Sequence, residues 1–335
     1  MERIGITPRQ EDGDLTAVLD LVREAEGLGY HSVWLGEAWG REIFTCLTAL
    51  ALGTSRIHLA SGIVNIFSRS PALMAMGAAT LDEVSGGRFI LGLGASGKIV
   101  IEQWHGTPFQ HPLQRTREYI EIIRIALSGE RVNYQGRFFR LQNFRLAFTP
   151  RRANLPIFVA AMGPQNLRLT GELADGCIPF LPSRSRFREV YLHPLEEGAK
   201  ARGRSLKDVE VAPYIITAVS PDGAEARALA RAHVAYYIGG MGIYYNNLVR
   251  RYGYVEEAEA IRQAWQQRDR EKAARLVTDA MLDDMALSGT PSQCRERLEA
   301  YSQVGATIPV LAFAHGSSRE RVREALHALA PKRPA

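Results

Sequence analysis

The chain has 335 residues, of which 46% are hydrophobic and 23% charged, as expected for a globular protein with a sizeable core. Its net charge is only +5, and the basic residues are dispersed along the expected helices, so we expect no nucleic-acid partner. No apolar run approaches the ~18 residues needed to cross a bilayer, and the start lacks a signal-peptide core. Three widely spaced cysteines show no metal or redox-pair spacing. We therefore expect a cytoplasmic protein without a membrane partner.

A βαβ unit is predicted within the first hundred residues. Apolar runs at 57–60 and 89–93 have the character of strands buried on both faces, and Pro71 opens a helix between them. The strands end in small residues, at 61–62 and 94–97, which would let a ligand approach the backbone. Because ligands of parallel α/β proteins bind at the carboxyl ends of the strands, we expect the functional site there.

Strand-like apolar runs alternate with amphipathic helices along the whole chain. This pattern is typical of a (β/α)8 TIM barrel, here a single domain over 1–335. Two insertions are expected: a β-hairpin at about 131–148, turning at Gln135 and Gly136, and a charged helical segment at about 224–287. The expected barrel strands are 3–6, 32–35, 57–61, 89–93, 156–161, 176–179, 209–219 and 308–312.

Three segments carry a resemblance to a known family: SGIVNIFSRSP, AATLDEVSGGRFILGLGASG and LPIFVAAMGPQNLRLTGELADG. In this order and spacing they resemble the bacterial luciferase-like superfamily, and within it the coenzyme F420-dependent oxidoreductases similar to methylenetetrahydromethanopterin reductases. The resemblance implies a homodimer that binds F420 and transfers a hydride between the deazaflavin and a small organic substrate. The alternatives are an FMN-dependent two-component monooxygenase and a non-catalytic cofactor-binding barrel.

Residues after the third expected strand would support the cofactor ring. Relatives have a non-proline cis peptide here, which in this chain falls at Gly62–Ile63 or, failing that, Ser61–Gly62. The residues alone also allow a glycine β-bulge at the barrel rim. The resemblance thus implies that the ring rests on Ser61, Gly62, Ile63 and Val64.

Other small-residue loops would hold the side chain of the cofactor. Relatives bind the phosphate where a strand ends and a helix begins, although the residues alone also allow an ordinary strand-to-helix turn. The residues that correspond are Ala160, Ala161, Met162, Gly163 and Pro164. After the fourth strand, small residues would let the cofactor pass, namely Ala95, Ser96 and Gly97. Arg184 could meet the phosphate or the acidic tail, unless its basic run is only a solvated surface.

Glu37 follows the second expected strand and should point into the barrel mouth. An acidic residue in this place in the deazaflavin branch lies near the ring edge, so Glu37 is the predicted catalytic residue, moving a proton. The alternatives are a carboxylate at a helix N-terminus and an ion pair with Arg41. Ala38 and Thr7 stand where relatives have a catalytic histidine or glutamate, so neither specific activity is implied. We expect no metal, because no paired-histidine motif occurs.

Overall fold

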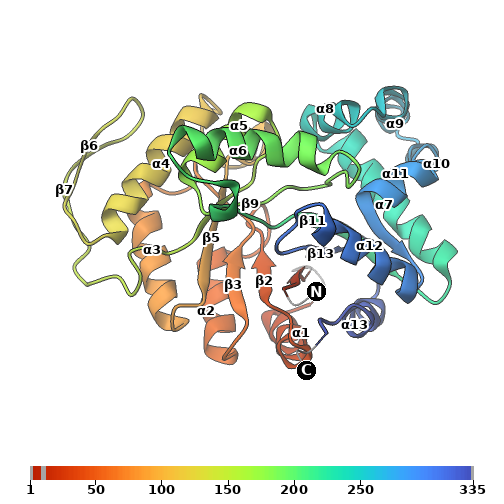
Figure 1. The fold of residues 1–335 in the computed structure, drawn as a ribbon, viewed down its shortest axis with the longest axis horizontal. Helices are drawn as coiled ribbons and strands as arrows, with labels where there is room; N and C mark the ends of the chain where they lie inside the picture. Colours follow the sequence, from red (N-terminus) through yellow and green to blue (C-terminus); the bar gives the residue numbers. More distant parts are fainter. Residues whose placement is uncertain (1–2, 9–12, 333–335) are drawn as a thin grey trace.

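The computed structural model describes residues 3–8 and 13–332 and contains a curled, fully parallel sheet surrounded by helices (Figure 1). Its strand order is β10-β9-β8-β5-β3-β2-β1-β13-β11-β12, with β4 added beside β5. The strands are β1 (Gly5–Thr7), β2 (Ser32–Leu35), β3 (His58–Ser61), β4 (Val64–Asn65), β5 (Phe89–Gly94), β8 (Ile157–Val159), β9 (Gly176–Cys177), β10 (Glu210–Val211), β11 (Tyr214–Val219), β12 (Ala286–Gly289) and β13 (Val310–Phe313).

The seventh expected strand, 209–219, closes the barrel but is not continuous. It is split into β10 and β11, because Pro213 has no N–H to donate to a ladder. On one side Ala212 N donates to Cys177 O at 2.8 Å, and on the other Val310 N donates to Pro213 O at 2.9 Å. These bonds join β9 to β13 through the interrupted strand, which confirms the predicted TIM barrel.

Helices follow most strands and cover the outside of the barrel (Figure 1). Several begin with a proline in the first turn, where its missing N–H costs nothing. The helices are α1 (Leu15–Leu28), α2 (Ile43–Gly53), α3 (Pro71–Val84), α4 (Pro112–Leu127), α5 (Pro164–Leu173), α6 (His193–Ala201), α7 (Gly223–Gly240), α8 (Ile243–Arg251), α9 (Val255–Gln266), α10 (Arg270–Arg275), α11 (Asp279–Met285), α12 (Pro291–Gln303) and α13 (Arg319–Ala328), with short π- and 3₁₀-turns at Val100–Trp104, Arg188–Leu192 and Leu206–Asp208.

Two apolar layers form the core. One lies inside the barrel and includes Trp34, Ile90 and Phe158, which point inward from neighbouring strands. The other lies between sheet and helices and runs from Ile4 to Leu329 as one cluster. Alternate strand residues therefore face alternate layers, as expected for strands buried on both sides.

The hairpin insertion consists of β6 (Val132–Gln135) and β7 (Arg140–Phe144). Its turn spans residues 136–139, since Gly136 N donates to Phe139 O at 2.9 Å. The turn thus begins one residue and ends three residues later than the predicted turn at Gln135 and Gly136. The buried Glu118 carboxylate of α4 accepts three backbone N–H groups from this turn. In Figure 1 the hairpin projects at the opposite edge from α8, α9 and α10.

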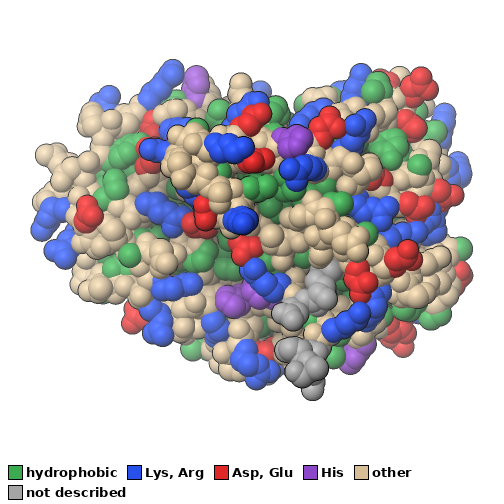
Figure 2. Space-filling view, in the orientation of Figure 1, with side chains coloured by type: hydrophobic (Ala, Val, Ile, Leu, Met, Phe, Trp, Pro, Cys, Tyr) green, Lys and Arg blue, Asp and Glu red, His purple; other side chains and the backbone are tan. Residues whose placement is uncertain are grey.

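The helical insertion comprises α7 to α11, but its predicted end was wrong. Residues 286–287 begin β12, an additional parallel strand that pairs with β11, Ala286 opposite Ile216. The strand was missed because ALSG contains no β-branched or aromatic residue, and its pairing partner lies about 70 residues away in the sequence. On the face seen in Figure 2, Lys and Arg side chains are interspersed with Asp and Glu.

Candidate functional site

The loops predicted to hold a cofactor meet at one end of the barrel. Strands β3, β5 and β8 are parallel neighbours, so their carboxyl ends lie side by side. A Cβ placed on Gly94 would lie 2.9 Å from Ile63 Cδ1 and 3.4 Å from Ala160 Cβ. The three segments therefore form one continuous wall of the barrel mouth, and we call it the main-chain wall: residues 61–64, 94–97 and 160–164.

The Gly62–Ile63 peptide bond is cis, as the resemblance implied. Tyr214 reaches this bond from β11, with its hydroxyl 3.5 Å from Gly62 O. A Cβ on Gly62 would lie 1.7 Å from the Tyr214 hydroxyl oxygen, so the close approach requires glycine. Ile63 O accepts the backbone N–H of Glu37 at 3.0 Å. The wall is thus fixed both from the barrel interior and from the loop after β2.

Three of the predicted cofactor residues are buried and support the wall from behind. The Ser61 hydroxyl donates to Gly92 O at 2.9 Å and accepts Gly92 N at 2.8 Å, which ties β3 to β5. Val64 and Ala161 belong to the layer between sheet and helices. The side chains of these three residues are not accessible, and their predicted contribution to the cofactor site stays a prediction.

The remaining predicted wall residues are at least partly accessible. Ser96 adopts a left-handed conformation, with φ of +60°, so the chain turns sharply after β5. A Cβ on Gly97 would meet nothing within 4 Å, so this loop borders open space. Beyond it, Trp104 packs edge-to-face on Trp39, with 5.0 Å between the ring centroids. Both indoles are more than half exposed, at 52% and 59%, and form an aromatic rim beside this loop.

The first turn of α5 lacks a side-chain cap. Gly163 is the N-cap residue, Pro164 opens the helix, and among the described residues no side chain caps the free N–H groups. A Cβ on Gly163 would also meet nothing within 4 Å. Asn166 donates from Nδ2 to Ala160 O at 3.2 Å, while its buried Oδ1 has no hydrogen-bond partner among the described residues. Uncapped N–H groups beside open space are the donor set that binds an anion.

Glu37 lies in the mouth, but its carboxylate is engaged. Arg69 donates to both oxygens, at 2.5 Å and 2.8 Å, and Ile43 N donates to Oε2 at 3.0 Å. Arg69 also pairs with Glu42, and the hydrogen bonds that it donates to Glu37 raise the pKa of Arg69. The side chains of Glu37 and Arg69 are only 12% and 14% exposed. Glu37 thus joins the loop after β2 to the loop after β3, and Arg69 is a partner that the sequence did not reveal.

Arg184 follows β9 in a loop that is held from the outside of the barrel. Its backbone N donates to Asp284 O at 2.9 Å, and the Asp284 carboxylate accepts Ser185 N at 2.7 Å. Tyr301 of α12 donates to the carbonyls of Pro182 and Asp284. The loop is therefore well fixed, although within the described residues no hydrogen bond or ion pair joins Arg184 to the main-chain wall. Its predicted role in binding the cofactor stays a prediction.

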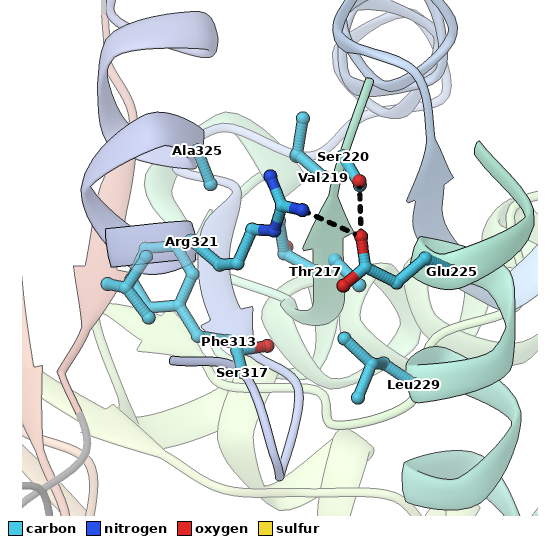
Figure 3. Close-up of a pocket in the computed structure, with 11 residues that line it drawn as sticks. Thr217, Val219, Ser220, Glu225, Leu229, Phe313, Ser317, Arg321 and Ala325 are labelled. Atoms are coloured by element: carbon cyan, nitrogen blue, oxygen red, sulfur yellow. Dashed lines mark hydrogen bonds and ion pairs between the residues drawn. The ribbon is translucent and has the colours of Figure 1, made fainter. Parts of the chain in front are cut away.

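A small cavity lies apart from the main-chain wall, between β11, β13, α7 and α13 (Figure 3). Its volume is about 10 Å³, room for one water molecule. Glu225 accepts hydrogen bonds from the Ser220 hydroxyl at 2.6 Å and from Arg321 Nη2 at 2.9 Å (Figure 3). Because these polar groups already satisfy one another and the space is small, this cavity cannot hold a flavin-sized ligand.

Within residues 3–8 and 13–332, no cluster of three or more His, Cys, Asp or Glu side chains is placed to hold a metal ion. No helix in that same part of the chain combines the length and the apolar character needed to cross a bilayer. Cys46, Cys177 and Cys294 are buried and form no disulfide.

Known proteins share this fold. The model of the family described as "Luciferase-like monooxygenase" matches residues 2–307, so the chain belongs to this family. It is 34% identical over 306 residues to the 5,10-methylenetetrahydromethanopterin reductase of Archaeoglobus fulgidus, covering 90% of both chains.

Solved structures of similar proteins have the same fold. The coenzyme F420-dependent tetrahydromethanopterin reductase of Methanopyrus kandleri superposes with a TM-score of 0.86 at 28% identity, covering 98% of this chain and 97% of that one. An F420-dependent secondary alcohol dehydrogenase in complex with an F420-acetone adduct gives a TM-score of 0.78, covering 98% of this chain and 99% of that one. At 19% identity this second likeness shows the fold alone.

Proposed function

We propose that this protein is a coenzyme F420-dependent oxidoreductase that transfers a hydride between the deazaflavin and a small organic substrate. The observation that carries the proposal is the main-chain wall, where three small-residue strand ends meet around Gly62–Ile63. The family membership and the reductase relatives of similar length support it. The bound deazaflavin would supply the ring carbon that gives or takes the hydride, and the protein would position the reactants.

The site fits such a cofactor in shape and in donor groups. A planar ring needs a wall without projecting side chains, and Gly62, Gly94 and Gly97 provide one. A phosphate needs converging N–H donors, and the uncapped first turn of α5 provides them. Ile63 would contact the ring side of the cofactor, and Ala160, Met162, Gly163 and Pro164 its phosphate side, as the resemblance implied.

Within this proposal Glu37 is the residue that holds or moves a proton near the substrate. Arg69 and Ile43 N fix its carboxylate at the mouth, so both oxygens keep a defined orientation. Ala38 offers no alternative proton carrier beside it. The exposed rings of Trp39 and Trp104 lie on the adjoining loops and would give a small organic substrate an apolar contact.

Native mass spectrometry of protein purified from an F420-producing host tests the proposal. We expect the retained mass to be that of F420, and reduced F420 to be oxidised without oxygen uptake once a substrate is supplied. Retention of FMN, together with oxygen uptake by the reduced flavin, would instead identify the protein as an FMN-dependent monooxygenase. Cofactor retention without turnover of any substrate would favour the non-catalytic barrel.

We also infer a homodimer that pairs through α2 and α3. Large apolar side chains are exposed on these adjacent helices: Leu73, Met76 and Val84 on one stripe of α3, and Leu52, 76% exposed, on α2. Such an apolar stripe is typical of a protein interface. Light scattering should give twice the chain mass for the native protein, and Met76→Asp together with Leu73→Asp should give a monomer.

A further inference from the structure

Arg251, the last residue of α8, reaches the predicted phosphate loop from the helical insertion. Its Nη1 donates to Met162 O at 2.8 Å, although the two residues are 89 positions apart in the sequence. Met162 directly precedes Gly163, the uncapped N-cap residue of α5. The guanidinium therefore lies beside the N–H groups that would bind an anion. The upper outline of the molecule dips between the parts that carry α5 and α8 (Figures 1 and 2).

The position of Arg251 is fixed by its neighbour. Tyr252 is 5% exposed, and its hydroxyl donates to Leu181 O at 3.1 Å and bonds the hydroxyl of Tyr191. The end of α8 thus holds the loop after β9 through Tyr252 and the loop after β8 through Arg251. An anchored helix end lets a long side chain keep one orientation, so the guanidinium is preorganised beside the loop.

The charge of Arg251 is not neutralised by the protein. In the described part of the chain no carboxylate lies within ion-pair distance of its guanidinium, whereas the adjacent Arg250 pairs with Glu259 at 3.4 Å. A carbonyl contact uses only one of the several N–H donors of an arginine. The remaining donors, at an exposed position, suit a phosphate, which arginine binds through two parallel hydrogen bonds.

We propose that Arg251 binds the phosphate of the cofactor, together with the first turn of α5, and thereby selects phosphorylated cofactors. This inference rests on the proposed function, because it assumes a cofactor on the main-chain wall. It assigns a binding role to the helical insertion, which is otherwise an addition to the barrel. Because Arg251 contacts Met162, on the phosphate side of the main-chain wall, its effect should fall on affinity for the phosphate and not on the chemical step.

Affinity titrations with three probes test the inference: F420, the deazaflavin riboside that lacks phosphate and glutamyl tail, and FMN. Arg251→Ala should weaken binding of F420 and FMN by about tenfold or more, while the riboside changes by less than about twofold. Arg251→Lys should give an intermediate loss, because it keeps the charge but not the planar fork. Arg250→Ala, the matched control, should bind all three like the native protein.

Other outcomes would overturn the inference. Native-like F420 affinity in Arg251→Ala would show that the guanidinium does not contact the cofactor. An equal loss for the riboside would show that Arg251 only shapes the loop, and a loss for F420 without a loss for FMN would place it on the glutamyl tail. If the native protein bound FMN but not F420, and Arg251→Ala still weakened FMN, the proposed function would fail while the role of Arg251 would stand.

Discussion

Opposite ends of the barrel use side chains in different ways. At the amino ends of the strands, side chains bind the backbone of the loops: one oxygen of Glu26 accepts the N–H groups of residues 55–57, at 2.7 to 2.9 Å. Arg88 donates to the carbonyls of Ala51, Thr54, Ile57 and Ser85. At the carboxyl ends, the main-chain wall leaves glycine backbone and helix N–H groups open.

Stability and function are thus assigned to opposite ends of the barrel. Satisfied loop backbones at the amino ends contribute to the free energy of unfolding, whereas open backbones at the carboxyl ends are available to a ligand. Substitutions at the two ends should therefore have different effects. Those at the amino ends should alter stability, and those at the carboxyl ends should alter binding and turnover.

The largest effect is expected at Glu37. Glu37→Gln removes the proton-carrying carboxylate but keeps an oxygen for Ile43 N, so turnover should fall by about 10²- to 10⁴-fold while cofactor affinity changes little. Glu42→Gln is the control, because Glu42 also pairs with Arg69 but caps α2 at an exposed position. Steady-state kinetics measure both variants. If Glu37→Gln retains turnover within about threefold of native, Glu37 is a structural residue of the rim.

Arg88→Ala should give the largest loss of stability at the amino ends. The variant leaves several loop carbonyls without their donor, so we expect the free energy of unfolding to fall by about 2–4 kcal/mol. Urea denaturation measures this loss, and cofactor affinity of the folded variant should be native. The exposed Arg56→Ala serves as control and should cost less than about 0.5 kcal/mol. Weakened cofactor binding in Arg88→Ala would contradict the assignment of stability to the amino ends and of binding to the carboxyl ends.

Gly62→Ala tests whether the main-chain wall tolerates a side chain. Because the new methyl group would lie 1.7 Å from the Tyr214 hydroxyl oxygen, either the wall or the tyrosine must move. We expect a loss of about 1–3 kcal/mol in stability and a cofactor affinity lowered at least about tenfold. Gly97→Ala, where the methyl meets nothing, should leave stability unchanged. Adding Tyr214→Phe to Gly62→Ala should restore part of the loss, and no such rescue would show that the clash is not the cause.

A smaller, pH-dependent effect is expected from His31 at the amino ends. Burial, aided by the nearby charges of His58 and Arg3, lowers the pKa of His31 from 6.5 to about 3. Folding therefore favours neutral His31. Its contribution to the free energy of unfolding is complete above pH 6.5 and is lost as the pH falls below 6.5. Between pH 6.5 and 5 this amounts to about 1–2 kcal/mol. Urea denaturation of His31→Gln should show a free energy of unfolding that depends less steeply on pH in this window. An unchanged slope would show that His31 does not cause the pH dependence.

Much of the barrel could be predicted, because its signals are local. Apolar runs bounded by glycine and proline located every barrel strand to within a few residues, and α1, which buries Val18, Val22 and Ala25, is one of the amphipathic helices expected between them. The Gly62–Ile63 cis bond was also anticipated, but from the resemblance and not from the residues. The interruption at Pro213 and the strand β12 were missed, since both depend on pairing with distant strands.

The site could be predicted only in part, for the same reason. The small residues of the main-chain wall stand in recognisable segments, whereas the partners that fix them come from elsewhere. Arg69 binds Glu37 across 32 positions, Tyr214 reaches Gly62 across 152, and Arg251 reaches Met162 across 89. The burial of Ser61, Val64 and Ala161 likewise depends on which layer each side chain faces. No sequence pattern specifies such pairings.

The central claim is that the main-chain wall and the first turn of α5 form a deazaflavin site. Titration of the apo protein with F420 and with FMN, followed by fluorescence at one ionic strength, tests it most directly. We expect F420 to bind at least tenfold more tightly, a difference of about 1.4 kcal/mol in binding free energy. Equal affinity, or tighter binding of FMN, would contradict the claim and assign the protein to the FMN-dependent monooxygenases of the family.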